Sequence, residues 1–165
     1  MAKTGEAVIC VYIASSLKHR LVAEHVALWL EAVTQYEIVS TWHKNAMSTV
    51  AVEKTLTLTE QTEIAGTCAD EVRKADALIW IYGDNDGRCG AAIECGIAIE
   101  LGRHRHLAPM MTPFLLEGPT SMEIYACPAP GATRSELPLM LYSARAWTHF
   151  DSIDVMLEEL GGAQT

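Results

Sequence analysis

Short apolar runs alternate with segments of helical periodicity over the first two thirds of the chain. The runs Ala7 to Ile13 and Ala77 to Tyr82 are continuously apolar, which is typical of strands buried on both faces of a parallel sheet. After the first run, apolar residues recur at positions 22, 26, 29, 30 and 33. This spacing predicts a helix that starts near Ser16 and stops before Tyr36. Residues 37–42 then predict a short second strand.

A second and a third helix flank the apolar run at 77–82. Thr57 and Glu60 have the spacing of a capping box, and apolar residues follow at positions 64, 68, 72 and 75. The preceding stretch, residues 44–57, is polar and predicts an irregular loop. After the run, the turn-rich segment 83–90 leads into a helix with Glu94 near its start and Gly102 just past its end.

The pattern weakens after Gly102. Residues 104–111 are compatible with a strand, and residues 112–138, which hold all but one of the prolines, predict a loop with room for a short helix. Either 139–142 or 146–150 would be the last strand, and Asp151 would cap a closing helix over 153–160. The whole predicts one domain, residues 1–165, with a doubly wound α/β fold. Its mostly parallel five-stranded sheet would carry helices on both faces, as in flavodoxin-like and Rossmann-like folds.

The charge and cysteine content of the chain limit the classes of partner and the cell compartment that we expect. The formal net charge is −9, which argues against a nucleic acid polymer or an anionic membrane but not against a small anionic ligand. Five cysteines without a CxxC pair favour a reducing compartment, with Cys10 and Cys68 as buried thiols. The start of the chain resembles a strand more than a signal peptide, and no apolar run is long enough for a membrane span. We expect a cytoplasmic protein without a cofactor, and no metal site at the basic run 104–106.

The glycine-rich turn before Glu94 is the segment that points most directly to a ligand. Glycines between a strand and a helix expose backbone N–H groups at a helix N-terminus, where α/β proteins bind ligands. The turn lacks the spacing of a dinucleotide fingerprint or a Walker A lysine. On position alone, Glu94 is better explained as an acid that complements the helix dipole than as a catalytic residue.

Several segments together resemble the nucleoside 2-deoxyribosyltransferase family, which includes nucleotide N-glycosidases and many phage-encoded members. They are YIASS (12–16), STWH (40–43), a segment from Asp70 to Arg103, and the tail from Trp147. Within the long segment, a G-x-x-x-E-x-G-x-A-x-x-L-G pattern is filled in register by Gly90, Glu94, Gly96, Ala98, Leu101 and Gly102. The resemblance implies an enzyme that cleaves the N-glycosidic bond of a 2′-deoxynucleoside or deoxynucleotide. Glu94 would be its nucleophile, and another base or water would accept the deoxyribosyl group.

The sequence departs from the family at the acid that assists the leaving base. An aspartate usually takes this part, but the position in register holds Cys68, and the nearest acid is Asp70. Asp70 is therefore our second catalytic candidate, although it faces another side of an ideal helix. The substrate-binding candidates are Tyr12 and Ala14 for the sugar, Ser15, Ser16 and Arg20 for a 5′-phosphate, Trp42 and His43 for the base, and Gly87 and Gly90 in the loop. Each also has a structural explanation: Tyr12 and Trp42 as packing residues, Ser16 as an N-cap, and Arg20 as a solvated charge.

Oligomerisation and other functions stay open at this point. Residues 107–128 hold many large apolar side chains among prolines, so we expect a homodimer or higher homo-oligomer; the alternative is that this stretch packs as a lid over the sheet edge. The alternatives to a transferase are a deoxynucleoside 5′-monophosphate hydrolase, a NAD-cleaving domain of TIR-like architecture, and a non-catalytic module that binds a nucleotide or NAD. The substitution at Cys68 favours the last of these.

Overall fold

Five parallel strands form the sheet of this protein. The computed structural model describes residues 8–33, 35–44, 55–83, 90–111, 122–132 and 147–162. Along the sheet the order is β2 (Tyr36–Ile38), β1 (Ile9–Ser15), β3 (Ala77–Tyr82), β4 (Glu123–Pro128) and β5 (Trp147–His149). The order reverses between β1 and β3, which is where ligands bind in doubly wound folds. The predicted fold class is confirmed.

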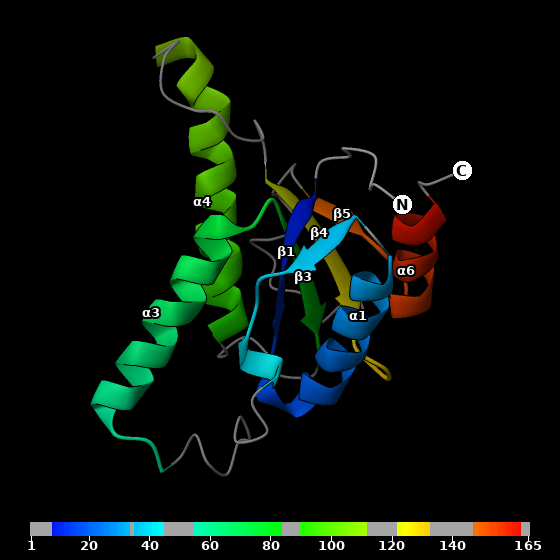
Figure 1. The fold of residues 1–165 in the computed structure, drawn as a ribbon, viewed down its shortest axis with the longest axis horizontal. Coiled ribbons are helices and arrows are strands. Elements are labelled where there is room, and N and C mark those ends of the chain that lie inside the picture. Colours follow the sequence, from blue (N-terminus) through cyan, green and yellow to red (C-terminus); the bar gives the residue numbers. More distant parts are fainter. Residues whose placement is uncertain are drawn as a thin grey trace, which may run out of the picture.

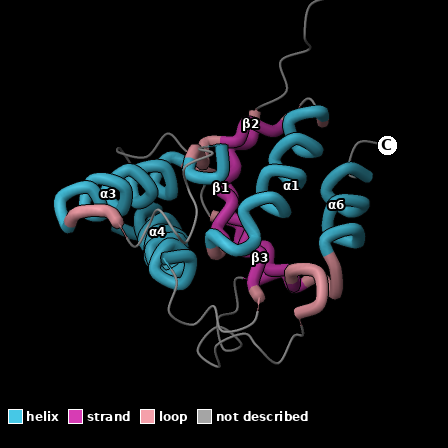
Figure 2. Tube along the Cα trace, turned by 90° about the horizontal axis from the view of Figure 1, so that it is seen from below, coloured by secondary structure: helices cyan, strands magenta, loops and turns pink. Residues whose placement is uncertain are grey.

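Helices cover both faces of the sheet, as Figures 1 and 2 show. α1 (Arg20–Ala32), preceded by the 3-10 turn η1 (Leu17–His19), lies with α6 (Ile153–Gly162) on one face. α3 (Leu58–Lys74) and α4 (Gly90–Met111) lie on the other face. In folds of this kind, ligands bind at the edge of the sheet where the strands end, and α1 and α4 begin at this edge.

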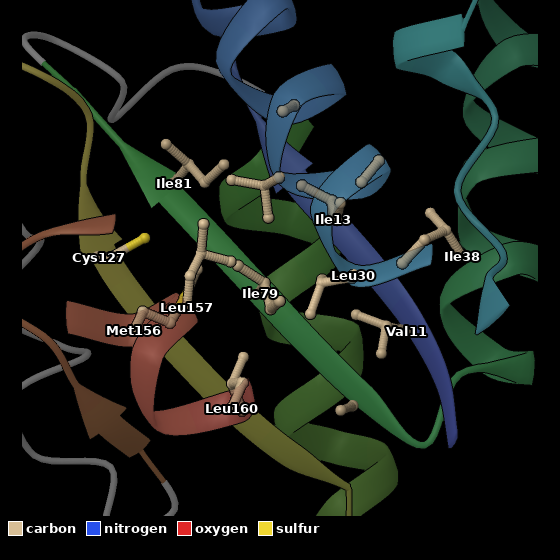
Figure 3. Packing of buried hydrophobic residues seen from close by; sticks show 14 of the residues in the cluster. Val11, Ile13, Leu30, Ile38, Ile79, Ile81, Cys127, Met156, Leu157 and Leu160 are labelled. Atoms are coloured by element: carbon tan, nitrogen blue, oxygen red, sulfur yellow. The ribbon is translucent and has the colours of Figure 1, made fainter. Parts of the chain in front are cut away.

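Alternate residues of the central strands feed two separate cores. Val11 and Ile13 of β1 and Ile79 and Ile81 of β3 pack under α1 and α6, and Leu30 is among the helical residues that cover them (Figure 3). Tyr12, Ala14, Leu78 and Trp80 pack under α3 and α4. All six residues of β3 are buried. This two-sided burial is why the strand is continuously apolar rather than alternating.

The first turn of α3 is fixed by its cap. Thr57 N–H donates to the Glu60 carboxylate at 2.8 Å, and Glu60 N–H donates to Thr57 Oγ1 at 3.3 Å. This reciprocal pair confirms the predicted capping box. Residues 58–67 are exposed, so the cap rather than core packing stabilises this half of the helix.

Three predicted elements were wrong in type or extent. The strand expected over 104–111 is the continuation of α4, which runs through Gly102 to Met111; an isolated glycine costs a helix only about 1 kcal/mol. The loop expected over 112–138 contains β4, whose Ile124 is buried in the sheet. β2 ends at Ile38, and the 3-10 turn η2 (Trp42–Lys44) follows it.

The remaining expectations concern the last strand, the closing helix and the burial of the cysteines. β5 selects the 146–150 alternative for the last strand, while 139–142 lies outside the described residues. The closing helix is present as α6, but Ser152 rather than Asp151 caps it, since Val155 N–H donates to Ser152 Oγ at 3.3 Å. Cys10 and Cys68 are only partly buried, whereas Cys95 and Cys127 are fully buried. In the described part of the chain, none of the helices has the length and apolar character that crossing a bilayer demands.

Candidate functional site

Glu94 and Tyr12 form a hydrogen bond just inside the carboxyl edge of the sheet. The hydroxyl of Tyr12, on β1, donates to Oε1 of Glu94, in the second turn of α4, at 2.8 Å. Small buried residues of α4, Ala91, Cys95 and Ala98, face the sheet. They let the helix approach closely enough for Glu94 to reach Tyr12, whose side chain has no exposed surface.

Two residues of α3 complete this cluster. Cys68 and Glu71 are three positions apart and therefore share one face of the helix. The Cys68 thiol lies close enough to Tyr12 and Glu94 for both to influence its pKa. Glu71 is 8% exposed, and its charge acts on Glu94. We call Tyr12, Cys68, Glu71 and Glu94 the acid cluster.

Burial controls the protonation of the acid cluster. Loss of solvent raises the pKa of Glu94 to about 7; hydrogen bonds from Tyr12 and Cys68 oppose this, and the charge of Glu71 adds to it. Burial raises the pKa of Cys68 to about 11. Burial and the charge of Glu94 also hold the pKa of Tyr12 far above its usual range. At neutral pH, Tyr12 and Cys68 are therefore protonated donors, and Glu94 titrates.

The segment after β2 is tied to the acid cluster through Glu71. Thr41 donates to the Glu71 carboxylate twice, from its backbone N–H at 3.2 Å and from its hydroxyl at 2.6 Å. Ser40 Oγ accepts from Ile13 N–H at 3.2 Å, and the Trp42 indole N–H donates to the Ile13 carbonyl at 2.7 Å. These bonds hold the ends of β2, β1 and α3 together.

The two residues predicted to contact a base have structural roles in this arrangement. The indole N–H of Trp42 is used by the Ile13 carbonyl. His43 has no exposed surface, its Nε2 lies 3.2 Å from Ser40 Oγ, and burial lowers its pKa. Their contact with a base stays a prediction, and it would require His43 to move outward or Trp42 to use only its ring face.

The three phosphate candidates differ in their availability. Ser15 donates its hydroxyl to the Ile81 carbonyl at 2.8 Å. Arg20 donates Nη1 to Glu24 at 3.2 Å and to the His43 carbonyl at 3.1 Å. Ser16, directly after β1, is buried, and its hydroxyl has no hydrogen-bond partner within the described ranges. Of the three, Ser16 is therefore the one whose polar group is not engaged by another described residue.

The structure does not bring Asp70 to Glu94. Its side chain is 68% exposed and accepts from Arg73 Nη1 at 2.7 Å on the outer side of α3. Glu71, which sequence reasoning missed, is the acid that faces the cluster. The signal was present, because Glu71 lies one turn after Cys68 on the apolar stripe of the helix.

The remaining candidates lie around the acid cluster or outside the described residues. Ala14 is fully buried on the same face of β1 as Tyr12. Gly90 is the first residue of α4, and a Cβ there would lie 4.0 Å from Glu94 Oε1. Gly87 lies outside the described residues. Within the described ranges, no group of three His, Cys, Asp or Glu residues is placed to hold a metal ion.

Comparisons with protein-family models, with curated proteins and with solved structures gave no match for this chain.

Proposed function

We propose that this protein cleaves the N-glycosidic bond of a 2′-deoxynucleoside or its 5′-monophosphate and transfers the deoxyribosyl group to a second base or to water. The supporting observation is the largely buried Glu94 carboxylate, held by Tyr12 at the switch point of a parallel sheet. The sequence resemblance implies a glutamate nucleophile at this same position. Because the Tyr12 hydroxyl binds one oxygen of the Glu94 carboxylate, the other oxygen can act on the sugar.

The reaction needs a negative charge beside the anomeric carbon and a proton for the leaving base. As the C1′–N bond breaks, its electron pair leaves with the base, and Glu94 forms an ester with C1′ or stabilises the cationic sugar. A second base or a water molecule then attacks C1′ and passes its proton to the departed base or to solvent, and the C1′–O bond to Glu94 breaks to release the carboxylate. Tyr12 stabilises that carboxylate in both steps by its hydrogen bond.

Cys68 occupies the position at which the resemblance places an aspartate for the leaving base. Its thiol is protonated at neutral pH because its pKa is about 11, but a thiol is a weak hydrogen-bond donor. A catalyst of this kind would favour bases that leave with little protonation. The same substitution supports a second candidate function, a nucleotide-binding module without catalysis.

A product analysis tests the proposal. The protein is incubated with a 2′-deoxynucleoside and a different free base, and separately with a 5′-monophosphate and with NAD, and the products are separated by chromatography. A new nucleoside supports transfer, and free base alone supports hydrolysis. Binding of these compounds without any turnover would replace the proposal by the binding module.

The matched variants are Glu94→Gln and Glu100→Gln, both on α4. Gln has nearly the same shape as Glu but cannot supply the negative charge or form the ester, so Glu94→Gln should lose nearly all turnover. Glu100 is exposed, and its variant should keep wild-type activity. Retention of more than about a tenth of the rate by Glu94→Gln, a loss under about 1.4 kcal/mol, would exclude Glu94 as nucleophile.

The proposal includes a homo-oligomer and a cytoplasmic location. Part of the apolar segment that suggested an interface is used within the chain, since Met122 and Ile124 are buried. Residues 112–121 of that segment lie outside the described residues. Resembling proteins often complete their pockets with a neighbouring subunit, and free thiols such as Cys95 and Cys127 suit a reducing compartment.

A further inference from the structure

A second cavity lies away from the acid cluster, at the amino ends of the strands. It has a volume of about 490 Å³ and is lined by the first residues of β1, β3 and β4 and by the last turns of α1 and α6. Val11 and Ile79 contribute to its apolar wall, and Leu30 and Leu160 close it from the two helices. These four side chains lie within the core cluster drawn in Figure 3. A cavity of this size is within the range of small-molecule sites.

The polar groups of this cavity are acidic or hydroxylic. Glu123 and Glu159 are exposed carboxylates in its lining. Tyr36 donates its hydroxyl to the Leu160 carbonyl at 3.2 Å, and Tyr125 donates its hydroxyl to the Glu123 carboxylate. Among the lining residues that the structure describes, none is a lysine, an arginine or a histidine.

Two helix C-termini add to the negative potential of this cavity. The last turns of α1 and α6 both lie at the cavity, and neither contains a basic residue. The carbonyl end of a helix carries a partial negative charge, which a cation in or near the last turn normally compensates. Lys44, a nearby cation, pairs with Glu31 at 2.9 Å and is not part of the lining.

We propose that this cavity binds a small organic cation, an ammonium or guanidinium group on an apolar body. The apolar body would cover the partly exposed side chains of Ile9 and Tyr36, and the cation would lie between Glu123 and Glu159. Tyr125, also partly exposed, offers its aromatic face to the same cation, and Phe150 packs against Tyr125 with ring centroids 6.0 Å apart. An anion would meet two carboxylates and two helix C-termini, and a neutral molecule would leave them uncompensated. This site is separate from the acid cluster and does not depend on its function.

The test uses three probes of one shape on the full-length protein. 2-Phenylethylammonium, 2-phenylethanol and phenylacetate are titrated separately into ¹⁵N-labelled protein, and backbone amide shifts are recorded by NMR. We expect the ammonium to shift the amides of Ile9, Ala77 and Thr148 and to bind at least about tenfold more tightly than the alcohol. Phenylacetate should leave these amides unchanged. Equal binding of the alcohol, shifts elsewhere only, or no shift at about 10 mM ammonium would overturn the proposal.

Adjacent glutamates of α6 provide the matched variants. Glu159→Gln removes a carboxylate of the cavity and should weaken 2-phenylethylammonium about fivefold. Glu158→Gln removes the same charge from an exposed neighbour outside the lining and should not change the affinity. The amide spectra of both variants report that the fold is intact. Equal weakening in both variants would assign the binding to net charge and refute the site.

Discussion

The buried position of Glu94 predicts that removing its charge makes the fold more stable. In Glu94→Gln, the side-chain amide oxygen still accepts the Tyr12 hydroxyl, and no carboxylate has to lose its water. The folded protein binds the Glu94 proton more tightly than the unfolded chain does, because burial raises the pKa from its ordinary value of 4.5 to about 7. The contribution of Glu94 to wild-type stability is therefore most favourable below pH 4.5, falls as pH rises to about 7, and stays level above it.

The expected change in the free energy of unfolding follows from that difference in pKa. A rise from 4.5 to about 7 corresponds to about 3 kcal/mol in the fully ionised state. Glu94 keeps part of its solvent contact, and at pH 5 a fraction of the loss has already occurred. We therefore expect the stability of Glu94→Gln, relative to wild type, to increase by about 2 kcal/mol between pH 5 and pH 8.

Urea unfolding at a series of pH values measures this difference. The midpoint of Glu94→Gln should move above that of wild type as pH rises, with an unchanged denaturant slope. Glu100→Gln, on the exposed side of the same helix, should follow the wild-type curve. A constant difference between Glu94→Gln and wild type at every pH would refute the inferred pKa, whatever the protein catalyses.

Three further predictions concern activity and assembly. The rate should rise with pH through a midpoint near 7. Tyr12→Phe should move that midpoint up by about one pH unit, because the charged form of Glu94 loses a hydrogen bond. Glu71→Gln should move the midpoint down, because a negative charge near Glu94 is removed. An unmoved midpoint in both variants would show that another group controls the profile. If monophosphates are substrates, Arg20→Ala should raise KM for the nucleotide and not for the nucleoside, and equal wild-type kinetics on both would exclude a phosphate site. Light scattering on an active sample should give at least twice the 18.0 kDa of one chain, and the mass of one chain would exclude a shared pocket.

Periodicity in the sequence predicts most of this fold and fails where other signals compete. The two-sided burial of β3 and the Thr57 capping box are local properties, so they can be read directly. β4 was missed because a short strand ending at Pro128 lies in a proline-rich segment that resembles a loop. The extension of α4 was missed because Gly102 suggested a helix end, although the helix continues through this residue.

The acid cluster was predicted in part for a comparable reason. Glu94 and Tyr12 were found from their motifs, and the structure places them in contact. Asp70 was chosen because it was the acid nearest to the expected register, whereas helix geometry places Glu71 on the inner face. The bonds from Thr41 to Glu71 join segments 30 residues apart and have no local signal.

The position of Glu94 in the structure bears on the two explanations that the sequence left open. A glutamate that only complements a helix dipole works from the exposed first turn, where it is hydrated and its charged form is favoured. Glu94 instead lies in the second turn, faces β1, and has a pKa raised by burial. Such a placement lowers stability at neutral pH, and glutamine would make the same hydrogen bond without that cost. This cost supports the proposed catalytic role of Glu94, because an ionisable acid near neutral pH can act as nucleophile or base.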